Sequence, residues 1–507
     1  MTVDTSADAP SDTADTPPRF PARTDASAAD RVPHDLFIGG RWRSAAGGTM
    51  KVVNPATEEV IAEVADADVT DAHEALRAAA DAQPDWAVTP ARTRSEVLYR
   101  TYQLMVERIE LLAELMTLEM GKPLAEARGE VTYAADLIRW FAEEAVRIDG
   151  GYAHRPDGAA RNLRLKQPVG PCLLIVPWNF PLAMGARKIG PAVAAGCTSI
   201  LKPAPHTPLS SLALAELFRE AGLPAGVLNV LPTSRAADIT PPMLESGIIR
   251  KLSFTGSTAV GKLLLAQAAK QVIRTSMELG GNAPFLVFED ADLDIAVEAA
   301  FLAKMRNTGE ACTAANRFLV HADLAEEFTA RLAERMGSLT VGNGLDEGVD
   351  VGPLIDEAAR QKVLGLMRDA VDRGATVVTG GNPVDGPGYF VQPTVLSNVT
   401  PDAALNRTEI FGPLAAIQTF TDLDEAVTRA NDSEWGLVGY VITRDLDRAL
   451  NVSERLEVGM VGLNTGIVST PSAPFGGIKE SGLGREGGSL GIEEYLETKY
   501  ISVPVRR

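Results

Sequence analysis

The stretch GPCLLIVPWNFP, residues 170–181, decides the fold class. Its apolar run at 171–176 is short and is bounded by glycine and proline, so we expect a buried strand. Helical spacing follows at 186–195, and further strand and helix patterns follow at 198–201, 210–221, 226–231, 252–254 and 258–269. Strands that alternate with helices indicate a parallel sheet with helices packed on its faces. The expected class is therefore α/β.

Other segments flank this alternation. Residues 35–42 and 50–55 have the pattern of short hairpin strands, and residues 68–148 have the apolar spacing of helices. A second series of strands and helices is expected over 283–473, without a sequence repeat of the first. Residues 1–34 hold few large apolar side chains, so we expect a disordered acidic tail without a targeting signal. The 507 residues allow two or three domains.

Composition excludes several classes of function. The chain has 67 acidic and 48 basic residues, and a net charge of −19 would repel a nucleic acid backbone. No apolar run is long enough to span a membrane. The three cysteines share no metal or redox spacing and the five histidines are scattered, so we expect no metal site. Few cysteines and no targeting signal favour the cytoplasm.

Ligands of parallel α/β sheets gather at the carboxyl ends of the strands, so the turns that follow strands are candidate sites. Four turns stand out there, PWNFP at 177–181, KPAP at 202–205, FTGS at 254–257 and ELGG at 278–281. Gly256 and Ser257 are expected at a helix N-terminus, where free N–H groups favour a phosphate such as that of a dinucleotide.

Two glycine patterns imitate nucleotide-binding motifs but lack their context. Residues 256–262 have the spacing of a P-loop, yet Leu263 stands where that loop needs Ser or Thr to hold magnesium. Residues 482–487 match GxGxxG, but no apolar strand precedes them and too few residues follow for a βαβ unit. Neither pattern is taken as a site.

Cys312 differs from the other two cysteines in its surroundings. Small and polar residues flank it in NTGEACTAANR, residues 307–317, whereas Cys172 and Cys197 lie among apolar residues and are expected to pack in the core. A thiol in a polar turn is a candidate nucleophile.

Six motifs in sequence order resemble those of the aldehyde dehydrogenase superfamily: PWNFP, KPA, FTGS, ELGG, NxGxxC at 307–312 and EIFGP at 409–413. The resemblance extends from about residue 36 to residue 505. It implies a Rossmann-like dinucleotide-binding domain (35–146 and 168–279), an α/β catalytic domain (280–480) and a β oligomerisation region (147–167 and 481–507) in a homodimer or homotetramer.

The resemblance also implies a mechanism. Cys312 attacks an aldehyde, the Asn179 side chain and the Cys312 N–H hold the resulting oxyanion, and Glu278 activates the water that hydrolyses the thioester. For Lys188, on the helix after PWNFP, a role in packing and a role in the site remain equally open.

The implied cofactor is a nicotinamide dinucleotide. By resemblance Lys202 lies near the adenosine ribose and Glu409 near the nicotinamide ribose. Many NAD-preferring relatives have Glu where this chain has Pro205, and the loss of that carboxylate eases a 2′-phosphate beside Lys202, with Ser257 or His206 as further partners. We therefore favour NADP over NAD. The full set of implied cofactor contacts is Trp178, Asn179, Lys202, Pro203, Ala204, Pro205, Gly256, Ser257, Leu279, Glu409 and Phe411.

The C-terminal run at 464–488 is similar to that of succinate-semialdehyde dehydrogenases, in which two arginines and a serine grip the distal carboxylate of the substrate. Arg187, Arg306 and Ser469 match them, and bidentate arginine suits a carboxylate. The alternatives are another semialdehyde such as glutarate semialdehyde, a plain aliphatic or aromatic aldehyde, or an inactive structural or binding protein on the same fold. Ala314 replaces a second cysteine of some relatives, which excludes a disulfide with Cys312, and Glu310 replaces a common Gln.

Overall fold

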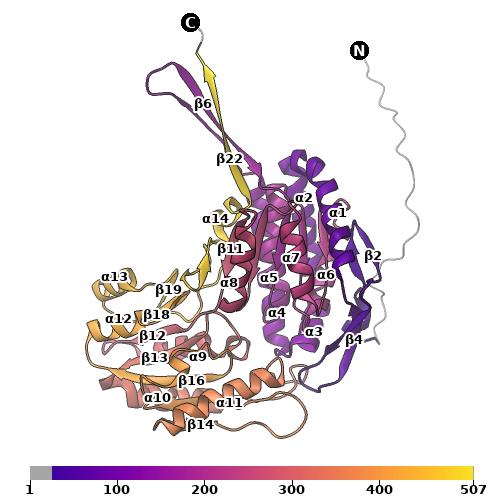
Figure 1. Cartoon of the computed structure of the whole chain (residues 1–507). Coiled ribbons are helices and arrows are strands. Elements are labelled where there is room, and N and C mark those ends of the chain that lie inside the picture. The colour runs from indigo at the N-terminus through magenta and orange to yellow at the C-terminus, as the bar shows by residue number, and fades with distance from the viewer. Residues whose placement is uncertain (1–25, 506–507) are drawn as a thin grey trace, which may run out of the picture.

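Two α/β sheets form the body of the computed structural model, which describes residues 26–505 (Figure 1). The first sheet has the strand order β2-β1-β9-β8-β7-β10-β11-β21, and its five strands from β9 to β11 run parallel. Their bounds are β1 Leu36–Ile38, β2 Arg41–Arg43, β7 Cys172–Ile175, β8 Ser199–Lys202, β9 Leu228–Val230, β10 Lys251–Thr255, β11 Arg274–Glu278 and β21 Gly482–Leu483.

Helices cover both faces of this sheet, as the alternation of strands and helices predicts. Along β7, Cys172 and Leu174 face one layer of helices, and Leu173 and Ile175 face the other. The first layer consists of α2 Ala91–Glu107, α3 Ile109–Met120, α4 Leu124–Ala145, α5 Pro181–Ala195 and α6 Pro208–Glu220. The second consists of α1 Val69–Val88, α7 Ala236–Glu245 and α8 Thr258–Ala269.

The second sheet has the order β14-β15-β16-β13-β12-β18-β19 and is parallel except for β14. Its strands are β12 Ala283–Val287, β13 Ala315–His321, β14 Thr376–Thr379, β15 Thr394–Ser397, β16 Leu414–Phe420, β18 Val438–Ile442 and β19 Met460–Leu463. Its helices are α9 Leu293–Met305, α10 Ala322–Gly337, α11 Glu357–Asp372, α12 Leu423–Asn431 and α13 Leu446–Arg455.

An antiparallel three-stranded arm projects from the body (Figure 1). It consists of β5 Gly151–His154, β6 Ala160–Pro168 and β22 Leu496–Pro504, and β22 pairs with β6 along its whole length. The smaller elements are the hairpin of β3 Thr49–Val53 with β4 Val60–Ala65, the pair β17 Trp435–Gly436 with β20 Ile478–Lys479, and the short helix α14 Gly488–Glu493.

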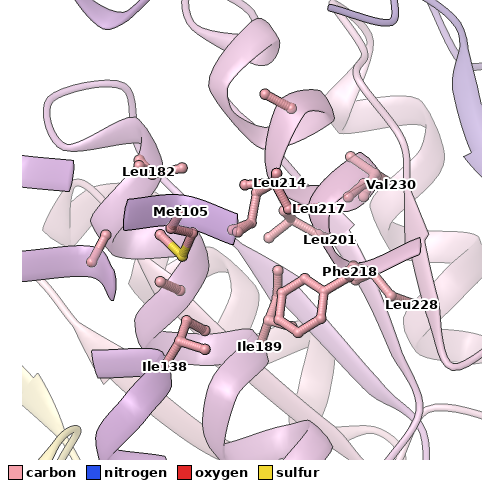
Figure 2. Packing of buried hydrophobic residues seen from close by; sticks show 14 of the residues in the cluster. Met105, Ile138, Leu182, Ile189, Leu201, Leu214, Leu217, Phe218, Leu228 and Val230 are labelled. Atoms are coloured by element: carbon pink, nitrogen blue, oxygen red, sulfur yellow. The ribbon is translucent and has the colours of Figure 1, made fainter. Parts of the chain in front are cut away.

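The largest core fills the space between the first sheet and the layer of α2 to α6. Figure 2 shows Met105, Ile138 and Ile189 from three helices meeting Leu201 and Leu228 of the sheet. Each such aliphatic side chain contributes about 1.5–3 kcal/mol when it is fully buried. This packing fixes the positions of β7 and β8, whose carboxyl ends carry two of the candidate turns.

Two buried glutamates fix the start of α5 and α6. Glu130 accepts hydrogen bonds from the Leu182 and Ala183 N–H groups at 3.0 Å, and Glu119 accepts from Leu209 and Ser210 at 2.8 and 2.9 Å. The free N–H groups of a helix N-terminus favour such anions. Helix α5 therefore begins at Pro181, earlier than the helical spacing of residues 186–195 suggests.

Two expected boundaries differ from the structure. Ser27 caps a short 3-10 helix, Ala28–Arg31, and the Ala28 and Ala29 side chains are buried in the main core, so the tail expected over 1–34 does not include these residues. Residues 1–25 lie outside the described residues. Of the described residues 481–505, the strand β22 joins the arm, whereas β21 pairs with β11 of the first sheet and α14 packs on α4 and α5. No helix in residues 26–505 is long and apolar enough to cross a membrane.

Candidate active site

A cavity of about 660 Å³ lies among the carboxyl ends of the first sheet and the loops of the second, and this volume is within the usual range for small-molecule sites. The structure brings nearly all predicted site residues to its wall. These are Trp178, Asn179, Arg187, Lys202, Ala204, Pro205, Gly256, Ser257, Glu278, Leu279, Arg306, Cys312, Glu409, Phe411 and Ser469. Pro203 is not among the lining residues; its carbonyl accepts a hydrogen bond from Lys202 instead.

The loop that carries Cys312 begins in an unusual turn. Asn307, Thr308 and Gly309 have φ values of 55°, 56° and 79°, so three successive residues are left-handed. Such a conformation costs non-glycine residues free energy and persists only where the surroundings enforce it. Glu126 helps to enforce it here, because its carboxylate accepts a hydrogen bond from the Asn307 N–H at 2.8 Å.

Hydrogen bonds join this turn to the PWNFP segment. The Asn307 side-chain amide donates to the carbonyls of Asn179 and Glu310, both at 3.0 Å, and Lys122 donates to the Asn179 carbonyl at 2.9 Å. Asn179 itself donates one amide hydrogen to the Glu310 carbonyl at 2.9 Å. Its second amide hydrogen remains available in the cavity, and the backbone N–H of Cys312 bonds to none of the described residues. Two donors are thus available near the thiol.

Glu278 ends β11 at the cavity wall and is only 2% exposed. Neither of its carboxylate oxygens has a hydrogen-bond partner within residues 26–505. Burial, and then the nearby carboxylate of Glu486, raise the pKa of Glu278 well above its usual range. Two carboxylate oxygens without partners at the cavity wall are placed to take a proton from water when the group is ionised, as a general base does.

Lys188 belongs to a buried ion pair. Its Nζ lies 2.5 Å from Glu486 Oε1 and 2.9 Å from Ser253 Oγ. Lys188 does not line the cavity. Of the two roles left open for this lysine, the structure favours the structural one, in which it compensates Glu486 beside the candidate base.

The thiol of Cys312 lies at the cavity wall between opposing charges. Burial, together with the Glu409 and Glu278 carboxylates, raises its pKa to about 12, although the Arg187 and Arg306 guanidinium groups oppose this shift. The side chain is therefore a neutral thiol at pH 7 in this state. Cys172 and Cys197 are fully buried in the core, as predicted.

The three residues expected to hold a substrate carboxylate all line the same cavity as the thiol. Arg187, on α5, is 3% exposed and its buried Nε has no acceptor in the described chain. Arg306 lies 4.9 Å from the centre of the Phe180 ring and makes no hydrogen bond or ion pair with residues 26–505. Ser469 comes from the loop after β19 and is half-buried. The guanidinium groups of Arg187 and Arg306 thus line the cavity, and neither forms a bidentate ion pair with a carboxylate of residues 26–505.

The other end of the cavity has features that suit a dinucleotide. Lys202 is buried at the end of β8, and within residues 26–505 its Nζ donates only to the Pro203 carbonyl, at 2.9 Å. Burial lowers its pKa to about 8. A buried cation without an anionic partner fits a ligand rich in oxygen atoms. Apolar side chains of α7 and α8, among them Ala236, Pro241, Val260 and Leu263, line the space beside it and fit a flat base.

Glu409 and Phe411 occupy the part of the cavity nearer to Cys312. Glu409 Oε1 accepts a hydrogen bond from the Gly281 N–H at 3.1 Å. Phe411 has a φ of 56°, which is unfavourable for an aromatic residue, and its ring meets Trp178 edge to face at 5.4 Å. The residues present therefore fit a nicotinamide dinucleotide. His206 lies outside the lining, 3.5 Å from Asp356.

Sequence reasoning missed several residues of the wall. Tyr133 on α4, Lys362 on α11 and Phe475 in the C-terminal loop all line the cavity, together with the α7 residues. Tyr133 and Lys362 lie on helices where ordinary amphipathic spacing hides them.

Glu310, which replaces a common Gln two residues before Cys312, does not line the cavity. Its carboxyl group accepts a hydrogen bond from the Ile355 N–H at 3.1 Å. Residues 26–505 contain no cluster of His, Cys, Asp and Glu suited to a metal ion.

Fold and site together define a class of protein: an α/β enzyme with a cysteine thiol at the wall of a cavity at the carboxyl ends of its sheet. The comparisons with known proteins agree. Residues 42–501 match the Aldehyde dehydrogenase family, and the chain belongs to this family.

Named relatives are similar over nearly their whole length. A succinate-semialdehyde dehydrogenase of Paenarthrobacter nicotinovorans is 58% identical over 444 residues, which cover 88% of this chain and 99% of the relative. A glutarate-semialdehyde dehydrogenase of Pseudomonas putida is 50% identical, with 92% and 97% covered. A solved Escherichia coli structure described as an NADP dependent enzyme has a TM-score of 0.93 at 47% identity and covers 95% of this chain and all of its own.

Proposed function

We propose that the protein oxidises succinate semialdehyde to succinate with a nicotinamide dinucleotide as the oxidant. The choice of substrate rests on one observation: the guanidinium groups of Arg187 and Arg306 line the same cavity as Cys312. An aldehyde with a distant carboxylate satisfies both ends of this arrangement, because the carboxylate pairs with the arginines while the carbonyl reaches the thiol. The names of the relatives support the same class of substrate.

The reaction begins at Cys312. Its thiol proton passes to water in the cavity, Sγ attacks the carbonyl carbon and forms a C–S bond, and the carbonyl π electrons move to the oxygen. The Asn179 amide and the Cys312 N–H donate to that oxyanion. A bound nicotinamide supplies the acceptor for the hydride that leaves this adduct. The product on the cysteine is a thioester.

Glu278 completes the reaction by releasing the acid. Its carboxylate takes a proton from water as the water oxygen attacks the thioester carbon, and the C–S bond breaks to return the thiol. Burial holds the pKa of this carboxyl high, so it accepts a proton more readily than an exposed glutamate does. Asn307 and Lys122 keep the Asn179 turn in place throughout.

NADP is the favoured cofactor. Pro205 lines the cavity close to Lys202, so no carboxylate at that position opposes a 2′-phosphate. Ser257 also lines the cavity, although its hydroxyl accepts from Val260 N–H at 3.4 Å as the cap of α8. A serine and a buried lysine can both donate to a phosphate. His206 is not part of this contact in the proposal, since it lies beside Asp356.

Glutarate semialdehyde is the second candidate, because a relative at 50% identity carries that name. It differs from succinate semialdehyde by one methylene, which discriminates by about 1–3 kcal/mol in a typical site. The arms of the experiment below separate the two substrates.

Steady-state oxidation of both semialdehydes and of uncharged butanal, each with NADP and with NAD, tests the proposal. We expect the largest kcat/KM for succinate semialdehyde with NADP. Arg306→Ala should lower kcat/KM for the semialdehydes by about 10-fold or more while affecting butanal less. An equal loss for charged and uncharged aldehydes would contradict the carboxylate site, and a larger kcat/KM with NAD would contradict the interpretation of Pro205.

A further inference from the structure

Two aromatic side chains that the sequence did not predict for the site, Tyr133 and Phe475, contact Arg187. The guanidinium group of Arg187 lies 4.1 Å from the centre of the Phe475 ring and 5.6 Å from that of Tyr133. Its Nη2 donates a hydrogen bond to the Tyr133 hydroxyl at 2.5 Å. The two rings confine the plane of the arginine, and the hydroxyl fixes its rotation within that plane.

Tyr133 belongs to the cavity as well as to Arg187. It lies on α4, is half-buried and lines the same cavity as Arg306 and Ser469. Its oxygen accepts from Arg187, so the phenolic hydrogen needs an acceptor of its own. The described chain, residues 26–505, offers it none. This O–H is therefore a donor without an acceptor next to the Arg187 guanidinium group.

Arg187 also has a carboxylate, that of Glu486, close to it on the side of the buried ion pair with Lys188. Its Nη1 is 3.9 Å from Glu486 Oε2, an oxygen that has no hydrogen-bond partner in residues 26–505. A small rotation of the guanidinium group would close this ion pair and direct the charge of Arg187 away from the cavity. The bond to the Tyr133 hydroxyl opposes that rotation.

We propose that Tyr133 is a substrate-binding residue, whose hydroxyl donates to the distal carboxylate of the semialdehyde while it accepts from Arg187. The proposal rests on the proposed function, because it assumes an anionic substrate. It adds a fourth member to the arrangement of Arg187, Arg306 and Ser469. It also gives Tyr133 a second effect, which is to hold Arg187 ready for the carboxylate and away from Glu486.

Tyr133→Phe tests this role, because it removes the hydroxyl and keeps the ring that stacks on Arg187. The measured quantity is the ratio of kcat/KM for succinate semialdehyde to kcat/KM for butanal, which has the same chain length and no carboxylate. We expect the ratio to fall about 10- to 100-fold, mainly through KM for the semialdehyde, since a hydrogen bond to a charged group is lost. Tyr99→Phe is the matched control, because Tyr99 is exposed on α2 and lies outside the cavity.

Binding of succinate gives a readout that is independent of turnover. Calorimetric titration of the cofactor-loaded enzyme with succinate should show Kd rising by a similar factor in Tyr133→Phe and remaining unaltered in Tyr99→Phe. An unaltered substrate ratio together with an unaltered succinate Kd would overturn the role of Tyr133. If the wild-type enzyme itself oxidises butanal as well as the semialdehyde and does not bind succinate, the proposed function fails, and the role of Tyr133 fails with it.

Discussion

The role of Cys312 could be predicted from the sequence, but the charges around its thiol could not. Its polar surroundings and the NxGxxC motif were enough to distinguish it from Cys172 and Cys197, which are buried in the core. The charges around it come from segments that are distant in the sequence. Glu278 ends β11, Glu409 lies in the loop before β16, and the two arginines lie on α5 and just after α9. Only the tertiary structure reveals that balance, because no local pattern specifies which charges surround the thiol.

Glu310 is a second residue whose role depends on its surroundings. The sequence suggested an acidic group close to the nucleophile, but the side chain is fully buried and directed to the Ile355 N–H. Burial raises the pKa of Glu310 well above its usual range, which favours the neutral carboxyl over the carboxylate. A neutral carboxyl has nearly the shape of a glutamine amide, which explains how both residues are accommodated at this position.

Glu310→Gln should therefore leave kcat/KM within about 2-fold at neutral pH, because neither form carries a charge there. The folded pKa of Glu310 is raised above its unfolded value, so its contribution to stability is present at low pH and is lost as pH rises through the folded pKa. The Tm of the variant should exceed that of the wild type increasingly as the pH is raised. Thermal unfolding at several pH values measures this, and a gap that narrows with rising pH would show that Glu310 is ionised in the folded protein. Glu310→Ala is the control, which should be destabilised at every pH because the Ile355 N–H loses its acceptor.

Among the elements, regular ones were predictable and irregular ones were not. The strands β7 and β8 and the helices α5 and α6 follow from apolar runs and helical spacing, with shifts of a few residues at their ends. The start of α5 was missed, because Glu130 on the separate helix α4 supplies its cap. The left-handed turn at residues 307–309 was also missed, since it depends on hydrogen bonds that Asn307 donates to the Glu126 carboxylate and the Asn179 carbonyl.

Gly309 tests whether this turn determines the position of the nucleophile. A methyl group there would overlap the carbonyl of Gly412, and the φ of 79° is unfavourable for alanine. We expect Gly309→Ala to lower the free energy of unfolding by about 2 kcal/mol or more and to reduce kcat, since the Cys312 loop has to move. Gly365→Ala is the matched control, because Gly365 lies in α11 with open space around it and should be neutral or slightly stabilising. Chemical denaturation and steady-state rates measure both, and normal behaviour of Gly309→Ala would contradict a rigid turn.

For the whole molecule, the α/β class and the meeting of four turns at one edge were predictable, because parallel strands place their carboxyl ends together. The cavity itself was not predictable. Its walls depend on how the second sheet is placed against the edge of the first, since loops of the second sheet carry Glu409 and Cys312. The arm of β5, β6 and β22 joins segments more than 300 residues apart in sequence, as the β6 to β22 pairing shows. Its prediction came from resemblance alone.

The arm is the proposed contact between subunits. Tyr152 on β5 and Tyr500 on β22 are 56% and 57% exposed, and an exposed apolar strand edge invites pairing with another chain. Tyr152→Asp should shift the enzyme to a smaller species in sedimentation velocity while the thermal transition of the subunit persists. Val106→Asp, which also replaces an exposed apolar residue but on α2, should leave the mass unaltered. An unaltered sedimentation coefficient for Tyr152→Asp would exclude the arm as the main contact.

The central claim is that Cys312 carries the substrate as a thioester and that Glu278 releases it. Mass spectrometry of Glu278→Gln, mixed with NADP and succinate semialdehyde and then quenched in acid, tests this most directly. We predict that one acyl group accumulates per subunit, that it maps to the peptide containing Cys312, and that reduced cofactor appears in the same amount, because hydride leaves before hydrolysis stalls. The double variant Cys312→Ala with Glu278→Gln should carry no acyl group. Free turnover of Glu278→Gln without an adduct, or an adduct on Cys172 or Cys197, would contradict the account.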